Sequence, residues 1–202
     1  PAALASAARG RPVEFAMLLA HASVLVGLEI YGSDSEPRTM PEWQSIRGDE
    51  MIPLDIVIEA FNESHRDYKA GLMDGVVVIR PVARRAPFLD QPLMVSDVDV
   101  VGVETALRKM FKAIDPSVDP SGGIVGSRRV TPEQAGDYVS VRFTRGKTVL
   151  QTLNEIASRT GLSWEVVTTR STEQEGASLI VFAGILHRRG TTSGIQIRDR
   201  TP

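Results

Sequence analysis

The chain has 202 residues, of which 42% are hydrophobic and 24% are charged, and this composition excludes a disordered or fibrous protein. Its formal net charge of −2 at pH 7 predicts no overall attraction to nucleic acid or to an anionic membrane. It contains no cysteine, which excludes disulfides and thiolate metal sites, and its length fits one large domain or two small ones.

The N-terminal segment predicts export. Residues 1–10, PAALASAARG, are small and lack an initiating Met, which is what remains when a signal peptide is cleaved at a small-residue site. The most apolar segment, residues 15–32, is interrupted by His21 and Glu29 and is too short and polar to span a bilayer. We therefore expect a periplasmic or extracellular protein without membrane insertion.

Four segments have the spacing of helices that pack on a sheet, with apolar residues at i, i+4 and i+7. Thr148 is suited to cap the fourth helix, and Gly161 follows that helix where a left-handed residue often ends one. Residues 131–134, Thr-Pro-Glu-Gln, predict a further short helix. The four apolar sets are Val13, Met17 and Ala20; Leu54, Ile58 and Phe61; Val103, Leu107 and Met110; and Val149, Leu153 and Ile156.

Strand-like runs rich in β-branched and aromatic residues follow three of these helices. The second run, residues 68–81, turns at Asp74 and Gly75, a pair typical of a tight hairpin. The third helix instead enters a loop rich in Pro, Gly and Ser that carries one short strand at Ile124-Val125. Extended segments also precede three of the helices, at residues 43–48, 92–100 and 138–146.

The pattern predicts an α+β fold of two small helix-on-sheet modules in tandem, with internal strand-helix-strand repeats. The first module covers residues 11–82, and the Pro- and Arg-rich residues 83–91 form a linker. A second, looser copy with a long internal loop covers residues 92–190. The tail, residues 191–202, has the alternation of an edge strand.

The first half resembles the secretin and TonB short N-terminal domain, and the second half resembles a looser copy of it. The resemblance implies an extracytoplasmic module that contacts partner proteins in an envelope secretion, transport or signalling system, and that is not an enzyme. The long loop after the third helix departs from the family and puts the strand order there in doubt. The matching residues are Gly48, Pro53, Leu54, Ile58 and Phe61, with Val76–Pro81 as the closing strand.

Two loops have the composition of anion-binding sites without their spacing. Residues 145–148, RGKT, end like a phosphate-binding loop, but that motif needs a glycine at position 141, which is Val. We expect a strand-to-helix turn there. Residues 121–129, SGGIVGSRR, lack the Gly-x-Gly-x-x-Gly spacing and are read as a connector.

No motif indicates catalysis or metal binding. None of His21, His65 and His187 has a His, Asp or Glu at the spacing of a helical metal site, so each is expected to be a surface or half-buried side chain. A Gly-x-Ser-x-Gly nucleophile elbow is absent. We predict no catalytic residue, no cofactor, no metal site and no small-molecule ligand.

The predicted function is therefore a non-catalytic interaction module with a protein partner, or self-association, and without nucleic acid. The polar turn between the last two strands of the second module and the alternating tail are the expected contact surfaces. Two alternatives stay open: a subunit of an extracellular assembly held by strand addition, and a hydrolase or ligand-binding protein with a site between the halves. The expected contact residues are Thr168, Arg170, Glu173, Ile195 and Ile197.

Overall fold

The computed structural model contains three α-helices, one 3-10 helix and nine strands among the residues that it describes. The helices are α2 (Pro12–His21), α3 (Leu54–Ser64) and α5 (Val149–Thr160), with the 3-10 helix η2 at Pro87–Asp90. The strands are β1 (Val26–Tyr31), β2 (Tyr68–Met73), β3 (Val76–Pro81), β4 (Asp99–Val101), β5 (Ser121–Gly123), β6 (Ser140–Arg142), β7 (Trp164–Arg170), β8 (Ala177–Gly184) and β9 (Ser193–Arg200). The described residues are 10–31, 53–83, 85–93, 99–101, 110, 121–123, 140–142, 144–161, 163–170, 177–184 and 193–200.

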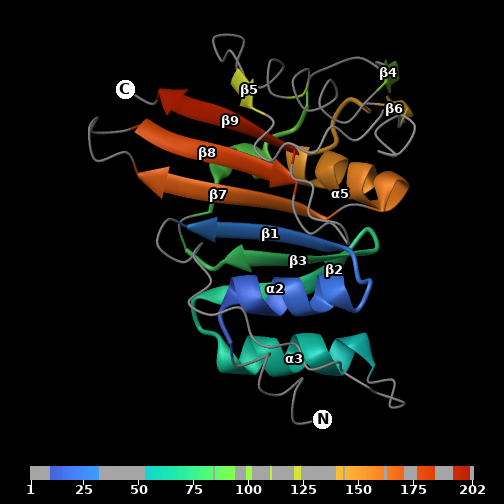
Figure 1. The fold of residues 1–202 in the computed structure, drawn as a ribbon, viewed down its shortest axis with the longest axis vertical. Helices are drawn as coiled ribbons and strands as arrows, with labels where there is room; N and C mark the ends of the chain where they lie inside the picture. The colour runs from blue at the N-terminus through green and yellow to red at the C-terminus, as the bar shows by residue number, and fades with distance from the viewer. Residues whose placement is uncertain are drawn as a thin grey trace.

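Seven strands form one mixed sheet in the order β2-β3-β1-β7-β8-β9-β5, and β4 pairs with β6 separately. Strand β1 runs parallel to both β3 and β7, whereas the other pairs in the sheet are antiparallel. Figure 1 shows these strands stacked side by side, with α2 and α3 at the β2 end. Helices packed on a mixed sheet confirm the predicted α+β class.

The hairpin of β2 and β3 has the predicted turn. Asp74 and Gly75 both have positive φ, at 53° and 78°, as a two-residue type I′ turn requires. The turn sets the register, in which Met73 faces Val76 and Tyr68 faces Pro81. Because β2 is the first strand of the sheet, its outer side is a sheet edge.

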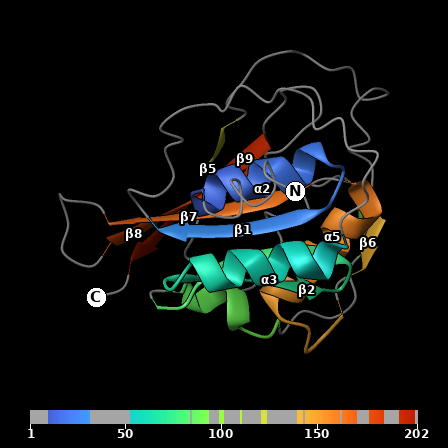
Figure 2. The same ribbon diagram turned by 90° about the horizontal axis from the view of Figure 1, so that it is seen from below.

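Helices α2 and α3 cover one face of the sheet and share its main core. Phe15 of α2 stacks on Phe61 of α3 with ring centroids 4.4 Å apart. Beneath them lie alternate residues of the strands, including Leu28 and Ile79, as the two-residue period of a strand requires. Figure 2 shows α2 lying on one side of β1. The predicted helices at Val13 and Leu54 are thus confirmed, together with their apolar faces.

The other face of the sheet carries η2 and α5. Thr148 caps α5 in a capping box with Gln151, and Gly161 ends this helix with φ at 70°, both as predicted. Gly27 of β1 faces Trp164 of β7 and lies directly under its indole ring. A Cβ on Gly27 would lie 2.2 Å from the ring, so the contact between β1 and β7 requires glycine at this position.

Strands from both predicted modules belong to the same sheet, joined where β1 pairs with β7 over Gly27 to Tyr31. The division into tandem modules stays a prediction. Residues 83–91, expected as a linker, include η2, whose Phe88 and Leu89 are buried. Val149 N–H donates to Gln91 O at 3.1 Å, which attaches the end of this segment to the start of α5.

Several predicted elements lie outside the described residues. They are the extended segment at 43–48, the strand at 124–125, the short helix at 131–134 and most of the third helix, of which Met110 alone is described. Met110 is helical and buried. Within the described ranges, no helix has both the length and the apolar character needed to cross a membrane.

Candidate functional site

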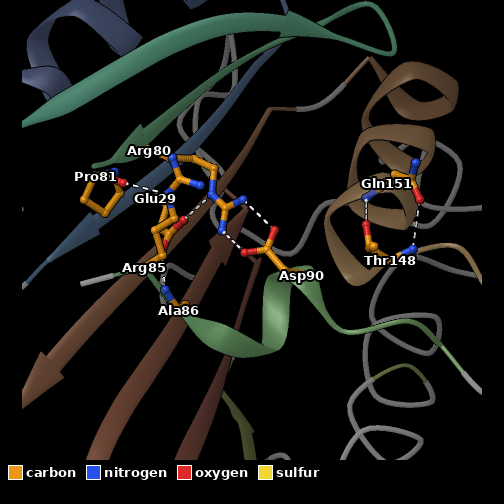
Figure 3. A network of polar contacts seen from close by, with 8 residues as sticks. All are labelled: Glu29, Arg80, Pro81, Arg85, Ala86, Asp90, Thr148 and Gln151. Atoms are coloured by element: carbon orange, nitrogen blue, oxygen red, sulfur yellow. Dashed lines mark hydrogen bonds and ion pairs between the residues drawn. The ribbon is translucent and has the colours of Figure 1, made fainter. Parts of the chain in front are cut away.

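A buried ionic cluster lies on the η2 side of the sheet, where β1, β3 and η2 meet (Figure 3). Arg80 of β3 donates from Nε to Glu29 Oε2 at 2.5 Å. Its two terminal nitrogens donate to the two carboxylate oxygens of Asp90 at 2.7 and 3.0 Å. Ala86 N–H donates to the other oxygen of Glu29. Glu29 and Arg80 are 1% and 8% exposed and lie in the protein interior, whereas the side chain of Asp90 is 54% exposed and lies at the surface.

Burial and pairing shift the acidities of this cluster. Burial raises the pKa of Glu29, against the hydrogen bonds from Ala86 and Arg80. The hydrogen bond from Arg80 lowers the pKa of Asp90. Burial acts to lower the pKa of Arg80, but its bonds to Asp90 and Glu29 outweigh that effect and raise it. Every carboxylate oxygen in the cluster already accepts a hydrogen bond, which is the arrangement of a structural clamp that holds residues 86–90 on the sheet.

A second buried polar group joins α5 to the sheet. Trp164 Nε1 donates to Asn154 Oδ1 at 2.9 Å, and Asn154 Nδ2 donates to Met73 O at 3.3 Å. Val26 N–H donates to Ser163 Oγ at 3.0 Å. These bonds also satisfy buried polar atoms, so they stabilise the fold. The same atoms have little hydrogen-bonding capacity left for a ligand.

A groove between α3 and the edge strand β2 is the surface with the features of a docking site. It has a volume of about 590 Å³ and is open to solvent. Leu72 beside it is 62% exposed, and Ile56 on α3 and Met73 on β2 are 53% and 42% exposed. Of these three residues only Leu72 lines the groove, and it gives the groove an exposed apolar side chain within a polar rim. The groove is lined by Asp55, Ile58, Glu59, Asn62, Glu63, Lys69 and Leu72.

Side chains of α3 and β2 close part of the groove floor. Ala70 N–H donates to Asn62 Oδ1 at 2.8 Å, and Asn62 Nδ2 donates to Ala70 O at 2.9 Å. Lys69 Nζ donates to Asn62 O at 2.7 Å and to His65 O at 3.4 Å, at the C-terminal end of α3. The sheet edge at Ala70 is thereby occupied, and the ammonium group of Lys69 is engaged by the helix end.

The acidic side chains of the groove form a stripe along α3. Asp55, Glu59 and Glu63 are all exposed and follow one another at four-residue spacing, which places them on one helix face. None of the three forms an ion pair with another described residue. Nor do described His, Asp and Glu residues form any group of three that could hold a metal ion. Within the part of the chain that the structure describes, the stripe is therefore an acidic surface without a cationic partner.

The contact residues expected from the sequence lie elsewhere. Thr168 and Ile197 share one row of the sheet, because each faces Ile180 of β8. Arg170 faces Ser178 in the same pair of strands, Ile195 of β9 faces Phe182, and Glu173 lies outside the described residues. The alternating tail forms β9, which pairs with β8 along its whole length and with β5 at residues 194–196. Thr168 and Arg170 are therefore on the central strand of the sheet, and Ile195 and Ile197 are on β9 towards the end opposite the groove. Their role as contacts stays a prediction.

Where the structure describes them, the histidines and the RGKT loop have the structural roles that the sequence predicts. His65 is half-buried as expected: its ring stacks on Phe61, and its two nitrogens lie 3.0 and 2.6 Å from Phe61 O and Gly10 O. His21 is in α2, and His187 lies outside the described residues. The loop at 145–148 is the predicted capped turn before α5, with Gly146 at a φ of 90°.

Sequence reasoning missed the groove, although one signal for it was present. The acids Asp55, Glu59 and Glu63 at four-residue spacing were visible on a helix already predicted. What the sequence did not reveal is that this face borders the sheet edge at β2. Comparisons of the chain with protein-family models, with curated proteins and with solved structures gave no match.

Proposed function

We propose that the protein is a non-catalytic interaction module that docks a partner protein on the surface made by α3 and β2. The observation that carries this proposal is the groove with Leu72 62% exposed at its margin, on a strand that ends the sheet. An edge strand that exposes apolar side chains can associate with another chain, so a partner that covers Leu72 would use this property of β2. The acidic rim keeps that surface soluble when the partner is absent.

The polar clusters support a non-catalytic role. A catalytic carboxylate needs access to substrate, whereas Glu29 is buried with both oxygens engaged by protein donors, and both oxygens of the exposed Asp90 accept hydrogen bonds from Arg80. The amide of Asn154 is likewise bonded on both sides and is fully buried. These groups have the shifted acidities that often mark active sites, but here burial and ion pairing inside the fold account for them.

The place of action proposed for the module is extracytoplasmic, in an envelope secretion, transport or signalling system. The support for this part is the resemblance of the first half to secretin and TonB short N-terminal domains. Two elements carry the resemblance, and both are next to the groove. One is α3, with Leu54, Ile58 and Phe61, which itself supplies groove residues, and the other is the strand Val76–Pro81, which begins four residues after Leu72.

Site-specific photo-crosslinking in the cells that produce the protein tests the proposal. A photoreactive residue in place of Leu72 is expected to give a discrete crosslinked species. Arg145 is an exposed control position in the turn before α5, and a photoreactive residue there should give none. The proposal would be overturned by the same crosslinking pattern from both positions, or by no adduct at Leu72.

A further inference from the structure

We propose that the segment seated in the groove is a cationic amphipathic helix of the partner, with Lys or Arg side chains one turn apart facing the acidic stripe. This inference rests on the proposed function, because it names the chemistry of the partner that the α3 and β2 surface receives. Its three supports are the charge of the groove, the spacing of the acids and the occupied edge of β2.

The charge of the groove favours a cation. The groove is lined by three carboxylates and one ammonium group. The ammonium group is that of Lys69, which already donates to the carbonyl oxygens of Asn62 and His65. An anionic polymer or an anionic lipid surface would meet like charge here. A cationic segment would face carboxylates that have no ion-pair partner among the described residues.

Asp55 is in the first turn of α3, where negative charge stabilises the helix, but Glu59 and Glu63 lie where they do not help it. Glu59 is four residues from both Asp55 and Glu63, and like charges at this spacing destabilise a helix. Glu63 is in the last turn, where the helix dipole disfavours negative charge, and this turn contains no basic residue. Folding alone therefore gives no reason for Glu59 and Glu63, whereas recognition of a cationic partner does.

The spacing of the acids indicates a helical partner. Four residues of α-helix rise about 6 Å, so carboxylates at i, i+4 and i+8 match Lys or Arg side chains placed one turn apart on a second helix. An extended strand would instead need the backbone edge of β2. That edge is occupied at Ala70, where the amide of Asn62 bonds both the N–H and the carbonyl group. Leu72 and Ile58 supply the apolar contact beside the charges.

A designed peptide and four variants of the full 202-residue chain test this inference. The probe is a labelled peptide of about 18 residues made of Leu, Lys and Ala, long enough to form a helix, with its lysines four residues apart on one face. A second peptide has the same composition with the lysines distributed around the helix. Binding is measured by fluorescence anisotropy at low and at moderate salt.

The double variant Glu59→Gln, Glu63→Gln is expected to weaken binding of the patterned peptide about tenfold, since two surface ion pairs are lost. Leu72→Thr, which keeps strand propensity, should also weaken it. The control Asp67→Asn removes an exposed charge that is not among the residues lining the groove and should leave the affinity within about twofold, because it forms no direct ion pair with a peptide seated there. Thermal unfolding of each variant shows that loss of binding is not loss of fold.

Three results would overturn the inference: equal affinity for both peptides, equal loss with Asp67→Asn and with the double variant, or no binding of the patterned peptide at low salt. A crosslink at Leu72 combined with any of them would leave the interaction module standing and reject the cationic helix. Glu59→Lys tests whether the peptide and the cellular partner bind the same surface. If they do, this reversal of charge should abolish both peptide binding and the crosslink at Leu72.

Discussion

The side-chain amide of Asn62 pairs with the backbone of Ala70 as a neighbouring strand would, accepting from its N–H at 2.8 Å and donating to its carbonyl oxygen at 2.9 Å. Asn62 is on α3 and Ala70 is on β2, the edge strand, so one side chain both fixes the helix on the sheet and blocks part of the edge. Edge strands are commonly protected from pairing with other chains in this general way.

Replacing Asn62 with Ala is expected to lower the free energy of unfolding by about 1 to 3 kcal/mol, because it leaves two backbone groups of Ala70 without their partner. The freed edge should also allow concentration-dependent self-association. Urea unfolding and analytical ultracentrifugation measure the two effects. Ser64→Ala is a control on the same helix, since it removes one exposed bond to Ala60 O and should change stability little. A monomeric Asn62→Ala chain of unchanged stability would contradict the role assigned to the pair.

Replacing Gly27 with Ala is expected to destabilise the protein by about 1 to 3 kcal/mol or more, the usual range for overpacking. The added methyl would lie 2.2 Å from the indole of Trp164, whose Nε1 is held by Asn154, so the ring cannot move without losing a buried bond. Gly71→Ala is the matched control. A Cβ there has nothing within 4 Å, and stability should be unchanged or slightly raised. Thermal unfolding measures the stability of the two variants, and equal stability of both would contradict the close contact between Gly27 and Trp164.

The parts of the fold that the sequence predicts are those that depend on neighbours along the chain. The Asp74-Gly75 turn follows from the residues that tolerate positive φ, and the ends of α5 follow from Thr148 and Gly161. The contact between Gly27 and Trp164 depends instead on residues far apart in the chain, and no local pattern announces it.

The same distinction explains the site. Glu29 was visible only as an interruption of an apolar run, because its partner Arg80 is 51 residues away. Residues 83–91 have the composition of a linker, yet Phe88 and Leu89 supply enough apolar surface to fix them on the sheet. The groove needs α3 and β2 to lie side by side, and although the two are close in the chain, helix spacing alone does not fix which face of α3 meets the edge.

Replacing Arg80 with Met is expected to cost about 3 to 5 kcal/mol of stability, because it leaves the carboxylate of Glu29 buried without its cation. The pKa of Glu29 is already raised by burial, and removing Arg80 removes a contribution that lowers it. A raised pKa in the folded state favours the protonated form, so the loss should be smallest in acid and grow as the pH rises. Adding Glu29→Gln to Arg80→Met should recover much of the lost free energy of unfolding. Denaturant unfolding at several pH values measures this free energy for each variant. A loss that does not vary with pH, or no recovery in the double variant, would contradict the ionic role.

Glu165 predicts a second pH dependence, at the junction of β1 and β7. It is a half-buried residue that lies between Leu28 and Ala183 in the sheet, and burial raises its pKa from its ordinary value of 4.5 to about 7. The folded state therefore binds this proton more tightly than the unfolded state. Its contribution to stability is fully present below pH 4.5 and is lost as the pH rises to about 7.

Glu165→Gln is expected to remove this loss. The free energy of unfolding of the variant minus that of the natural chain should therefore be about 1 to 3 kcal/mol larger at pH 8 than at pH 4.5. The comparison between the two proteins cancels the other groups that titrate in the same range. Asp67→Asn is the control, because it removes one carboxylate from an exposed position that lies outside both the acidic stripe and the junction of β1 and β7, so it should not show this gain. Equal pH profiles for natural chain and Glu165→Gln would show that the carboxyl group of Glu165 is solvated and titrates as it does in the unfolded chain.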